Sequence, residues 1–403
     1  MTWGVGANDL ANVMSTTLGS RSVSIRQMII FIIIFEFAGA YLGGEQVAET
    51  LRSGIINSSA SNLTAHTLVS GMLAVLLAGS TWMLIASYFG LPVSITHTII
   101  GAMVGFSTIV LGVGAVHWHK VELIGFSWLF SPLLSGMMAY GLFLSLQKLV
   151  FDTANPFPAA KRWAPFYLFL IGITFSLVSV LKGLKHLGYH LTLSIDVAIA
   201  VGMGASMVII GLLILRTIQC SKDCSRRAQF AYTEKIFAVL MIFTACAMVF
   251  AHGSNDVANA VGPMAAIITV VQSHGQVPQS STLLPPWIIF LGCVGVILGL
   301  LMYGRKVIAT VGSGITTLTP SRAFAATLAA ATTVVMATGV GIPVSATQTL
   351  VGAILGVGLA RGIGALNLRV VRHIFASWLI TIPAGASLAI FYFFGFDWLL
   401  HYL

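Results

Sequence analysis

The sequence predicts an all-α polytopic membrane protein, an inverted-topology repeat with about 11–12 transmembrane or re-entrant helical segments. Three observations predict this fold class. The 403 residues are 57% hydrophobic and only 8% charged, whereas a soluble domain has about 25% charged residues. Apolar runs long enough to cross a bilayer recur along the whole chain. Two polar motifs each occur twice, in the same order in both halves.

The apolar runs place the spans along the chain. The predicted spans are 27–44, 66–89, 92–115, 123–147, 163–181, 190–216, 236–272, 286–304, 323–340, 343–360 and 373–396. The run 236–272 is too long for one simple helix, and we expect it to break near His252–Asp256. Residues 4–20 look like the later part of a similar broken helix. The runs 66–115 and 323–360 are each either two full spans or one re-entrant hairpin.

The basic residues orient these spans. With both termini outside, the inside segments hold 16 of the 20 Lys and Arg residues, which is the bias expected of loops on the cytoplasmic side. Those segments are 21–26, 148–162, 216–235, 305–322 and 361–372. The net charge of +9 therefore reflects topology rather than nucleic-acid binding. The compact loop 217–234 favours a prokaryotic inner membrane, and its Cys220 and Cys224 are expected to be reduced, solvated thiols.

The two polar motifs indicate a duplication. Gly6–Asn12 (GANDLAN) matches Gly253–Asn259 (GSNDVAN), and Gly90–Thr98 (GLPVSITHT) matches Gly341–Thr349 (GIPVSATQT), at offsets of 247 and 251 residues. The predicted organisation has three parts. They are a first repeat at 1–150 with motifs at 6–13 and 90–98, linking spans and a basic loop at 151–235, and a second repeat at 236–403 with motifs at 252–260 and 341–349. In the predicted topology the two copies enter the membrane from opposite sides.

The Asn-Asp motifs predict a cation site. A break in a membrane helix is tolerated where the freed backbone lines a cavity, and Asp and Asn oxygens there suit a small cation or, at the carboxylate, a proton. The candidate ligands are Asn8, Asp9, Asn12, Asn255, Asp256 and Asn259, with Asp9 and Asp256 holding Na⁺ if sodium is the coupling ion. Asn12 and Asn259 could equally satisfy freed backbone. Glu36 is a carboxylate in mid-span, which indicates function.

The PVS motifs predict an anion site. Each reads as a helix start whose free N–H groups attract an anion, and hydroxyl groups lie beside it. The candidate residues are Ser94, Thr96, Thr98, Ser345, Thr347 and Thr349, although Thr98 and Thr349 could instead be packing residues. Cation ligands paired with two anion-binding helix ends favour a cation-coupled anion symporter.

These motifs resemble those of the inorganic phosphate transporter (PiT) family, and the resemblance runs from Gly6 past Gly356. TPSRAF at 319–324 and YGRKVIATVG at 303–312 also look like that family. The resemblance implies phosphate symport driven by Na⁺ or H⁺ and a homodimer. It also implies cation sites lined by Asn8, Asp9, Asn255 and Asp256, and phosphate held by Ser94, Thr96, Ser345 and Thr347. No cofactor and no catalytic residue is expected.

Three departures from the family pattern stand out. Gln348 occupies a position where the family often has histidine, although His97 is kept. Thr327 lies where a glutamate is common. Only seven residues precede Asn8, so we expect that the N-terminus is truncated and that an upstream-extended form is needed for activity or stability.

Rival functions stay open at this point. A permease for sulfate or another oxyanion would keep the fold, and a cation exchanger would use the aspartates but leave the PVS helix starts unexplained. A channel is disfavoured by duplicated buried carboxylates. A membrane-embedded enzyme is disfavoured because the chain carries no HExxH or GxSxG motif.

Overall fold

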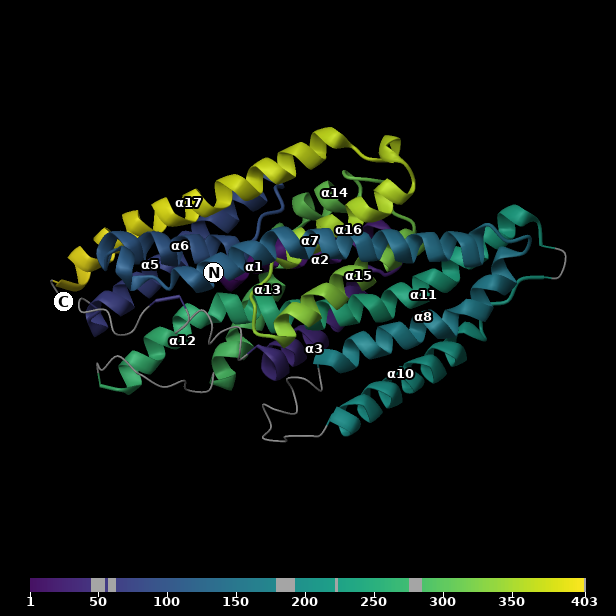
Figure 1. Cartoon of the computed structure of the whole chain (residues 1–403), viewed down its shortest axis with the longest axis horizontal. Helices are drawn as coiled ribbons and strands as arrows, with labels where there is room; N and C mark the ends of the chain where they lie inside the picture. The colour runs from purple at the N-terminus through teal and green to yellow at the C-terminus, as the bar shows by residue number, and fades with distance from the viewer. Residues whose placement is uncertain (45–54, 57–62, 179–192, 222–223, 275–284, 402–403) are drawn as a thin grey trace.

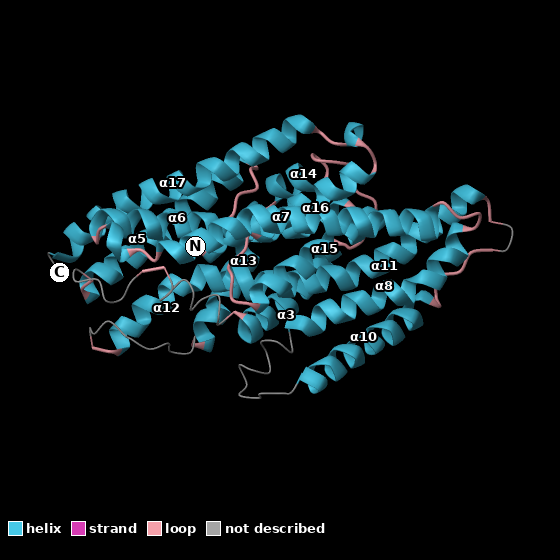
Figure 2. Cartoon of the chain, viewed as in Figure 1, coloured by secondary structure: helices cyan, strands magenta, loops and turns pink. Residues whose placement is uncertain are grey.

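The computed structural model describes residues 1–44, 55–56, 63–178, 193–221, 224–274 and 285–401. This part of the chain is helical throughout, apart from short turns and one isolated bridge between Ile56 and Val116 (Figure 2). The all-α fold class is thereby confirmed. A chain with so many apolar residues forms helices in a membrane because a helix satisfies its own backbone N–H and C=O groups.

The helices follow one another in an order that repeats (Figure 1). The first half contains α1 (Thr2–Val5), η1 (Gly6–Leu10), α2 (Ala11–Gly19), α3 (Ile25–Gly43), α5 (Ala65–Phe89), α6 (Ile95–Val110), η2 (Val113–Ala115), α7 (Trp118–Leu146) and η3 (Gln147–Phe151). The linking helices are α8 (Pro156–Val178) and α10 (Leu193–Leu215). The second half contains α11 (Arg226–His252), η5 (Gly253–Val257), α12 (Ala258–Gln272), α13 (Pro286–Tyr303), α14 (Arg305–Gly312), α15 (Pro320–Gly339), α16 (Ala346–Ala360), η6 (Ile363–Ala365) and α17 (Leu368–His401).

Within the described residues, each predicted span coincides with a helix or with consecutive helices, and residues 179–181 and 190–192 of two predicted spans lie outside the described part. Among the described residues, eight helices are long and apolar enough to cross a membrane. α6 and α16 are shorter, and each packs back against the helix before it, so α5–α6 and α15–α16 form two helical hairpins. α14 lies in a segment that was predicted to be a loop.

The predicted helix breaks at the Asn-Asp motifs are wrong in their form. Gly6–Leu10 and Gly253–Val257 are π-helical segments, with right-handed helical backbone continuing on both sides. The motif glycines serve close packing instead of a break. A Cβ on Gly6 would lie 1.7 Å from the carbonyl oxygen of Val296, and one on Gly253 would lie 2.2 Å from that of Glu36. Such single π turns are common at functional sites.

Contacts between the halves recur in matching pairs. α16 packs on α7, where a Cβ on Gly352 would meet the carbonyl oxygen of Pro132, and α6 packs on α17, where one on Gly101 would meet that of Ile382. The second helix of each hairpin thus lies against the long helix of the other half. These pairs agree with the duplication; the inverted orientation of the repeats and their boundaries stay predictions.

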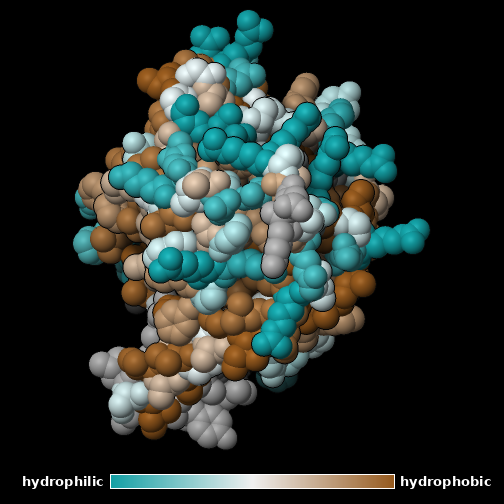
Figure 3. Space-filling model, turned by 90° about the vertical axis from the view of Figure 1, so that its right-hand side faces the viewer, coloured by the Kyte–Doolittle hydropathy of each residue, from teal (hydrophilic) through white to brown (hydrophobic). Residues whose placement is uncertain are grey.

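The segments with most of the basic residues lie toward one end of the molecule. α7 ends there, and α8 and α11 begin there, on the right in Figure 1, whereas α17 begins nearer the middle. Seen end-on, this face carries many long hydrophilic side chains above an apolar flank (Figure 3). We call it the basic end; the charge distribution predicts that it faces the cytoplasm.

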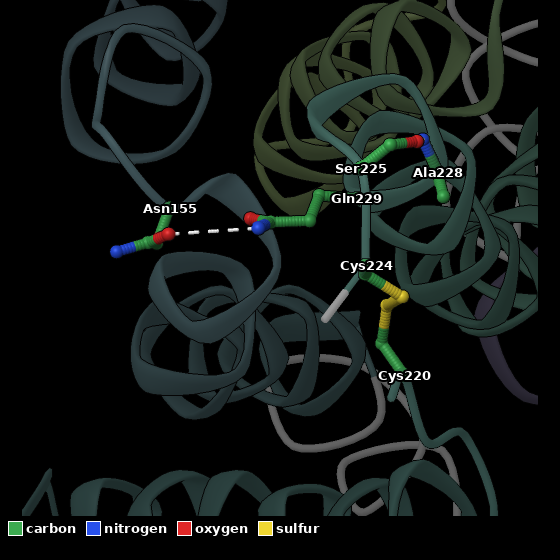
Figure 4. The surroundings of a disulfide bond; sticks show 6 residues. All are labelled: Asn155, Cys220, Cys224, Ser225, Ala228 and Gln229. Carbon is green, nitrogen blue, oxygen red and sulfur yellow. Dashed lines mark hydrogen bonds between the residues drawn. A yellow bond between two sulfur atoms is a disulfide. The ribbon is translucent and has the colours of Figure 1, made fainter. Parts of the chain in front are cut away.

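The loop between α10 and α11 carries a disulfide instead of two free thiols. Cys220 and Cys224 are bonded, with their Cα atoms 6.4 Å apart (Figure 4). Ser225 follows directly and caps α11 by accepting a hydrogen bond from the N–H of Ala228. The loop sequence alone did not indicate this bond.

The close backbone contact of Gly253 predicts that a larger side chain at this position destabilises the protein. Gly253→Ala should lower the free energy of unfolding by about 1–3 kcal/mol, because the methyl group overpacks the crossing with α3. Gly141→Ala is the matched control, since a Cβ there has nothing within 4 Å and alanine favours the helix by about 0.5–1 kcal/mol. Thermal unfolding of both variants in detergent, followed by tryptophan fluorescence, compares them; equal midpoints would contradict the packing account.

Candidate functional site

The two hairpins turn at Gly90 and Gly341, and the PVS segments that follow these glycines are buried in the protein. Gly90 (φ 68°) and Gly341 (φ 76°) adopt left-handed backbone that suits glycine, and the chain then runs extended into the next helix. Val93 and Val344, one in each tip, are fully or almost fully buried. Each PVS motif therefore forms a buried tip and the start of a helix, as the sequence predicted.

Ser94 and Ser345 cap the helices that start at the tips. The Oγ of Ser94 accepts from the N–H of His97 at 3.3 Å, and the Oγ of Ser345 accepts from the N–H of Gln348 at 3.1 Å. Both side chains are buried. Each hydroxyl keeps its own proton, which can be donated to a ligand at the helix start.

The motif asparagines hold the tips in place. Asn8 donates to the carbonyl of Leu91 at 2.9 Å and accepts from the N–H of Val93 at 2.9 Å. Asn255 does the same at the second tip, donating to the carbonyl of Val344 at 2.7 Å and accepting from its N–H at 3.4 Å. Both amides are thus engaged with backbone, which makes them positioning residues for the tips in this conformation.

Asp9 joins the two hairpins. One carboxylate oxygen accepts from the N–H of Ile95 in the first turn of α6 at 3.1 Å. The other accepts from the hydroxyl of Thr347 in α16 at 2.5 Å. In the matching direction, Thr96 of α6 donates to the carbonyl of Val344 in the second tip at 3.1 Å. Each PVS threonine therefore reaches across to the other half.

The outer asparagines of the motifs differ from each other. Asn259 donates to the hydroxyl of Thr96 at 2.9 Å, whereas its Oδ1 has no hydrogen bond among the described residues. Neither the oxygen nor the nitrogen of the Asn12 side chain has one. Both residues are fully buried, and buried polar groups are normally satisfied. Asn12 and Asn259 therefore offer buried polar atoms that a ligand can use.

Asp256 belongs to a second polar cluster, formed with Glu36 and His252. The Nδ1 of His252 lies 2.6 Å from a carboxylate oxygen of Glu36, and its Nε2 lies 3.6 Å from a carboxylate oxygen of Asp256. All three side chains are buried. Asn255, which bonds to the second tip, also donates to the carboxylate of Asp256 at 3.0 Å, so this cluster adjoins the hairpin tips.

Sequence reasoning did not assign a role to His252. At the repeat offset its counterpart is Val5, so the duplication that revealed the other residues gave no signal for this one. The available signal was a titratable side chain directly before the motif in a fully apolar run. Glu36 was singled out by that criterion, and the structure supplies its partner.

Thr98 and Thr349 stand apart from the other candidates. Their hydroxyls donate to the carbonyls of Ser94 and Ser345, one helical turn back, at 2.8 and 2.7 Å. Such back-bonding is the usual state of a threonine inside a helix. Both residues are buried, but their protons are already used, which favours the packing role over direct ligand contact.

The positions that depart from the family pattern also lie near this region. His97 stacks on Trp128 with ring centroids 3.9 Å apart, and Gln348 lies beside it on the neighbouring hairpin. Thr327 donates to the hydroxyl of Thr16 on α2 at 2.9 Å, and both are fully buried.

The arrangement can hold an oxyanion and a cation side by side. Two helix starts bring backbone N–H groups and hydroxyls to one place, and carboxylates from the two π-helical segments lie next to them. A cation would offset the charge of the buried aspartates. The unsatisfied oxygens of Asn12, Glu36 and Asn259 are hard ligands that fit a small cation.

Comparisons with known proteins agree with this chemistry. Residues 5–389 match the phosphate transporter family. A Haemophilus influenzae protein named "Putative phosphate permease" is 47% identical over 98% of this chain and 93% of its own length. The chloroplastic inorganic phosphate transporter 2-1 of Arabidopsis thaliana is 37% identical over 97% of this chain and 70% of its own length. A solved structure titled "The sodium-dependent phosphate transporter" superposes with a TM-score of 0.89 at 35% identity, covering 100% of this chain and 96% of that one. The chain therefore belongs to the phosphate transporter family.

Proposed function

We propose that this protein is a secondary active transporter that carries inorganic phosphate together with Na⁺ by alternating access about the hairpin tips. The observation that carries the proposal is the position of Asp9, whose carboxylate bonds to α6 through Ile95 and to α16 through Thr347. A single carboxylate shared by both helix starts links anything bound at one tip to the conformation of the other.

Phosphate would bind at the helix starts. Ser94, Thr96, Ser345 and Thr347 supply hydroxyls there, and the first turns of α6 and α16 supply N–H groups. Phosphate near neutral pH still carries a proton and can donate a hydrogen bond to a carboxylate, whereas sulfate cannot. The closeness of Asp9 to Thr347 therefore favours phosphate over sulfate.

The coupling ion would bind next to the second cluster. The carboxylate of Asp256 and the unsatisfied oxygens of Glu36, Asn12 and Asn259 supply the donor set. His252 would hold Glu36 in place through its 2.6 Å contact. A solved relative at 35% identity is named as sodium-dependent, and this supports Na⁺ ahead of H⁺ as the coupling ion.

Alternating access would move the hairpins relative to the long helices. The two tips are joined by side-chain hydrogen bonds and not by a shared helix or strand. A small rearrangement of these bonds could therefore open the site to either side of the membrane. A homodimer, both termini outside and an inner-membrane location stay predictions.

Phosphate uptake into proteoliposomes tests the proposal. We expect an inward Na⁺ gradient to drive uptake of labelled phosphate and a pH gradient alone to drive little. Asp9→Asn should lower uptake by about 10-fold or more, because an amide cannot accept both hydrogen bonds and a bond to a charged group contributes about 1.5–3 kcal/mol.

The matched control is Asp397→Asn. This carboxylate is about half exposed and lies 3.5 Å from His66, far along the chain from the tips, so uptake should be unchanged. Uptake driven only by the pH gradient would replace Na⁺ by H⁺ in the proposal. No phosphate uptake under either gradient, by this chain or by an upstream-extended form, would refute it.

A pair of threonine variants tests which hydroxyls serve the site. Thr347→Val keeps the shape but removes the bond to Asp9, and we expect uptake to fall about 10-fold. Thr349→Val removes only a bond to helix backbone and should have a much smaller effect. Equal losses in initial uptake rates would show that the back-bonded threonine is as important as the crossing one.

Competition with unlabelled sulfate tests the choice of anion. We expect excess sulfate to leave phosphate uptake nearly unchanged, because sulfate brings no proton to the Asp9 carboxylate. Strong inhibition by sulfate, or uptake of labelled sulfate, would favour a general oxyanion permease of the same fold.

A further inference from the structure

Two arginines converge on one threonine at the basic end. The Nη1 atom of Arg322, in the first turn of α15, lies 3.1 Å from the carbonyl oxygen and 3.2 Å from the hydroxyl of Thr317. The Nη1 atom of Arg361, just after α16, lies 3.5 and 3.2 Å from the same two atoms. It also donates to the hydroxyl of Thr316 at 3.0 Å. We call these four residues the arginine pair site.

The two guanidinium groups are not neutralised by a direct ion pair. Among the described residues, no carboxylate lies within 4 Å of Arg322 or Arg361. Glu234 is near enough for its charge to interact with Arg322, but both its oxygens accept from Ser321, at 2.9 and 2.8 Å. Two like charges lie close together here. Within the described part of the protein only the Nη1 atom of each guanidinium forms hydrogen bonds, which leaves several N–H donors for a planar or tetrahedral oxyanion.

The equivalent loop in the first half has uncharged residues at the positions of the two arginines. The N–H of Asn367 donates to the carbonyl of Ile315 at 2.9 Å, and the N–H of His117 donates to that of Ile55 at the same distance. The sequences also match there, with RGIGA at 361–365 repeating LGVGA at 111–115 and SGIT at 313–316 repeating SGII at 53–56. The two loops thus share one backbone contact, from His117 to Ile55 and from Asn367 to Ile315.

The arginines occupy positions that are uncharged in the other copy. Arg361 corresponds to Leu111, and Arg322, three residues after the cap of its helix, corresponds to Thr67. A charge pair that closes the loop would be needed at both ends if its role were structural. Among the described residues the pair occurs at one end only, which favours a function specific to that side.

Polar side chains lead from the hairpin tips toward this site. Asn8, Asn12 and Thr16 are spaced four residues apart, so they share one face of the helix that carries Asp9. Thr16 meets Thr327 of α15 at 2.9 Å, and Arg322 is five residues earlier in α15, about 7.5 Å along the helix axis. The arginine pair site thus lies on the same helix as Thr327, where this polar row ends, but further along the axis and on another face.

We propose that Arg322, Arg361 and Thr317 bind a phosphate group at the basic end of the protein. One source is free phosphate that leaves or enters the transport site, and this alternative rests on the proposed function. The other source is the headgroup of an anionic phospholipid in the adjoining leaflet. Both present tetrahedral phosphate oxygens to the two guanidinium forks.

Vesicles of opposite orientation test the free-phosphate source. Uptake of labelled inorganic phosphate is measured in right-side-out and inside-out membrane vesicles that contain the full chain. Replacing both arginines (R322Q with R361Q) should raise the half-saturating phosphate concentration about 10-fold on the basic side. The opposite side should change by less than about twofold, which also shows that the variant is folded.

A second measurement tests the lipid source. The purified protein is loaded with phosphatidylglycerol or with phosphatidylcholine, and retained lipids are counted by native mass spectrometry. If the site holds a headgroup, the wild type should retain more phosphatidylglycerol than the double variant, with no difference for phosphatidylcholine. Arg369→Gln is the matched control for both measurements, since it removes an exposed charge of the same end.

The two phosphate sources predict different results. A one-sided kinetic shift supports free phosphate, and a selective loss of phosphatidylglycerol supports the headgroup. No change in either measurement, or an equal change in Arg369→Gln, overturns the proposal. If the wild type transports no phosphate at all, the proposed function fails, and the lipid count alone decides whether the arginine pair binds a phosphate group.

Discussion

A buried carboxylate inside the bilayer must find partners within the protein, and the rest of this structure depends on how Asp9 finds them. It bonds to the backbone of one hairpin and to a side chain of the other. These bonds require both tips to reach the centre of the molecule, which explains why α6 and α16 are short and start there. They also require close helix crossings, which the motif glycines permit.

The duplication gives the two halves a common arrangement of helices. The residues at which the halves differ have separate roles. Asn8 and Asn255 perform the same task at the two tips. Glu36 and His252 occur in one half only and adjoin Asp256. The duplicated scaffold thus carries an asymmetric set of titratable groups.

Most of the fold was predictable because membrane spans leave a strong signal in composition and charge. The predicted spans coincide with helices, and the motifs identified the residues that meet at the tips. The π-helical segments were not predictable, because Gly6 and Gly253 permit either a break or a close crossing. His252 was missed because its counterpart is Val5. The back-bonding of Thr98 and Thr349 depends on local helix geometry, and the Cys220–Cys224 bond depends on the turn before α11.

The most direct test is a structure of the protein with arsenate, a heavier analogue of phosphate, located by anomalous scattering. The account predicts a peak between the starts of α6 and α16, within hydrogen-bond distance of Thr96 or Thr347 and beside Asp9. A peak elsewhere, with the hairpin tips still bonded to each other as they are here, would contradict the assignment of the tips as the transport site.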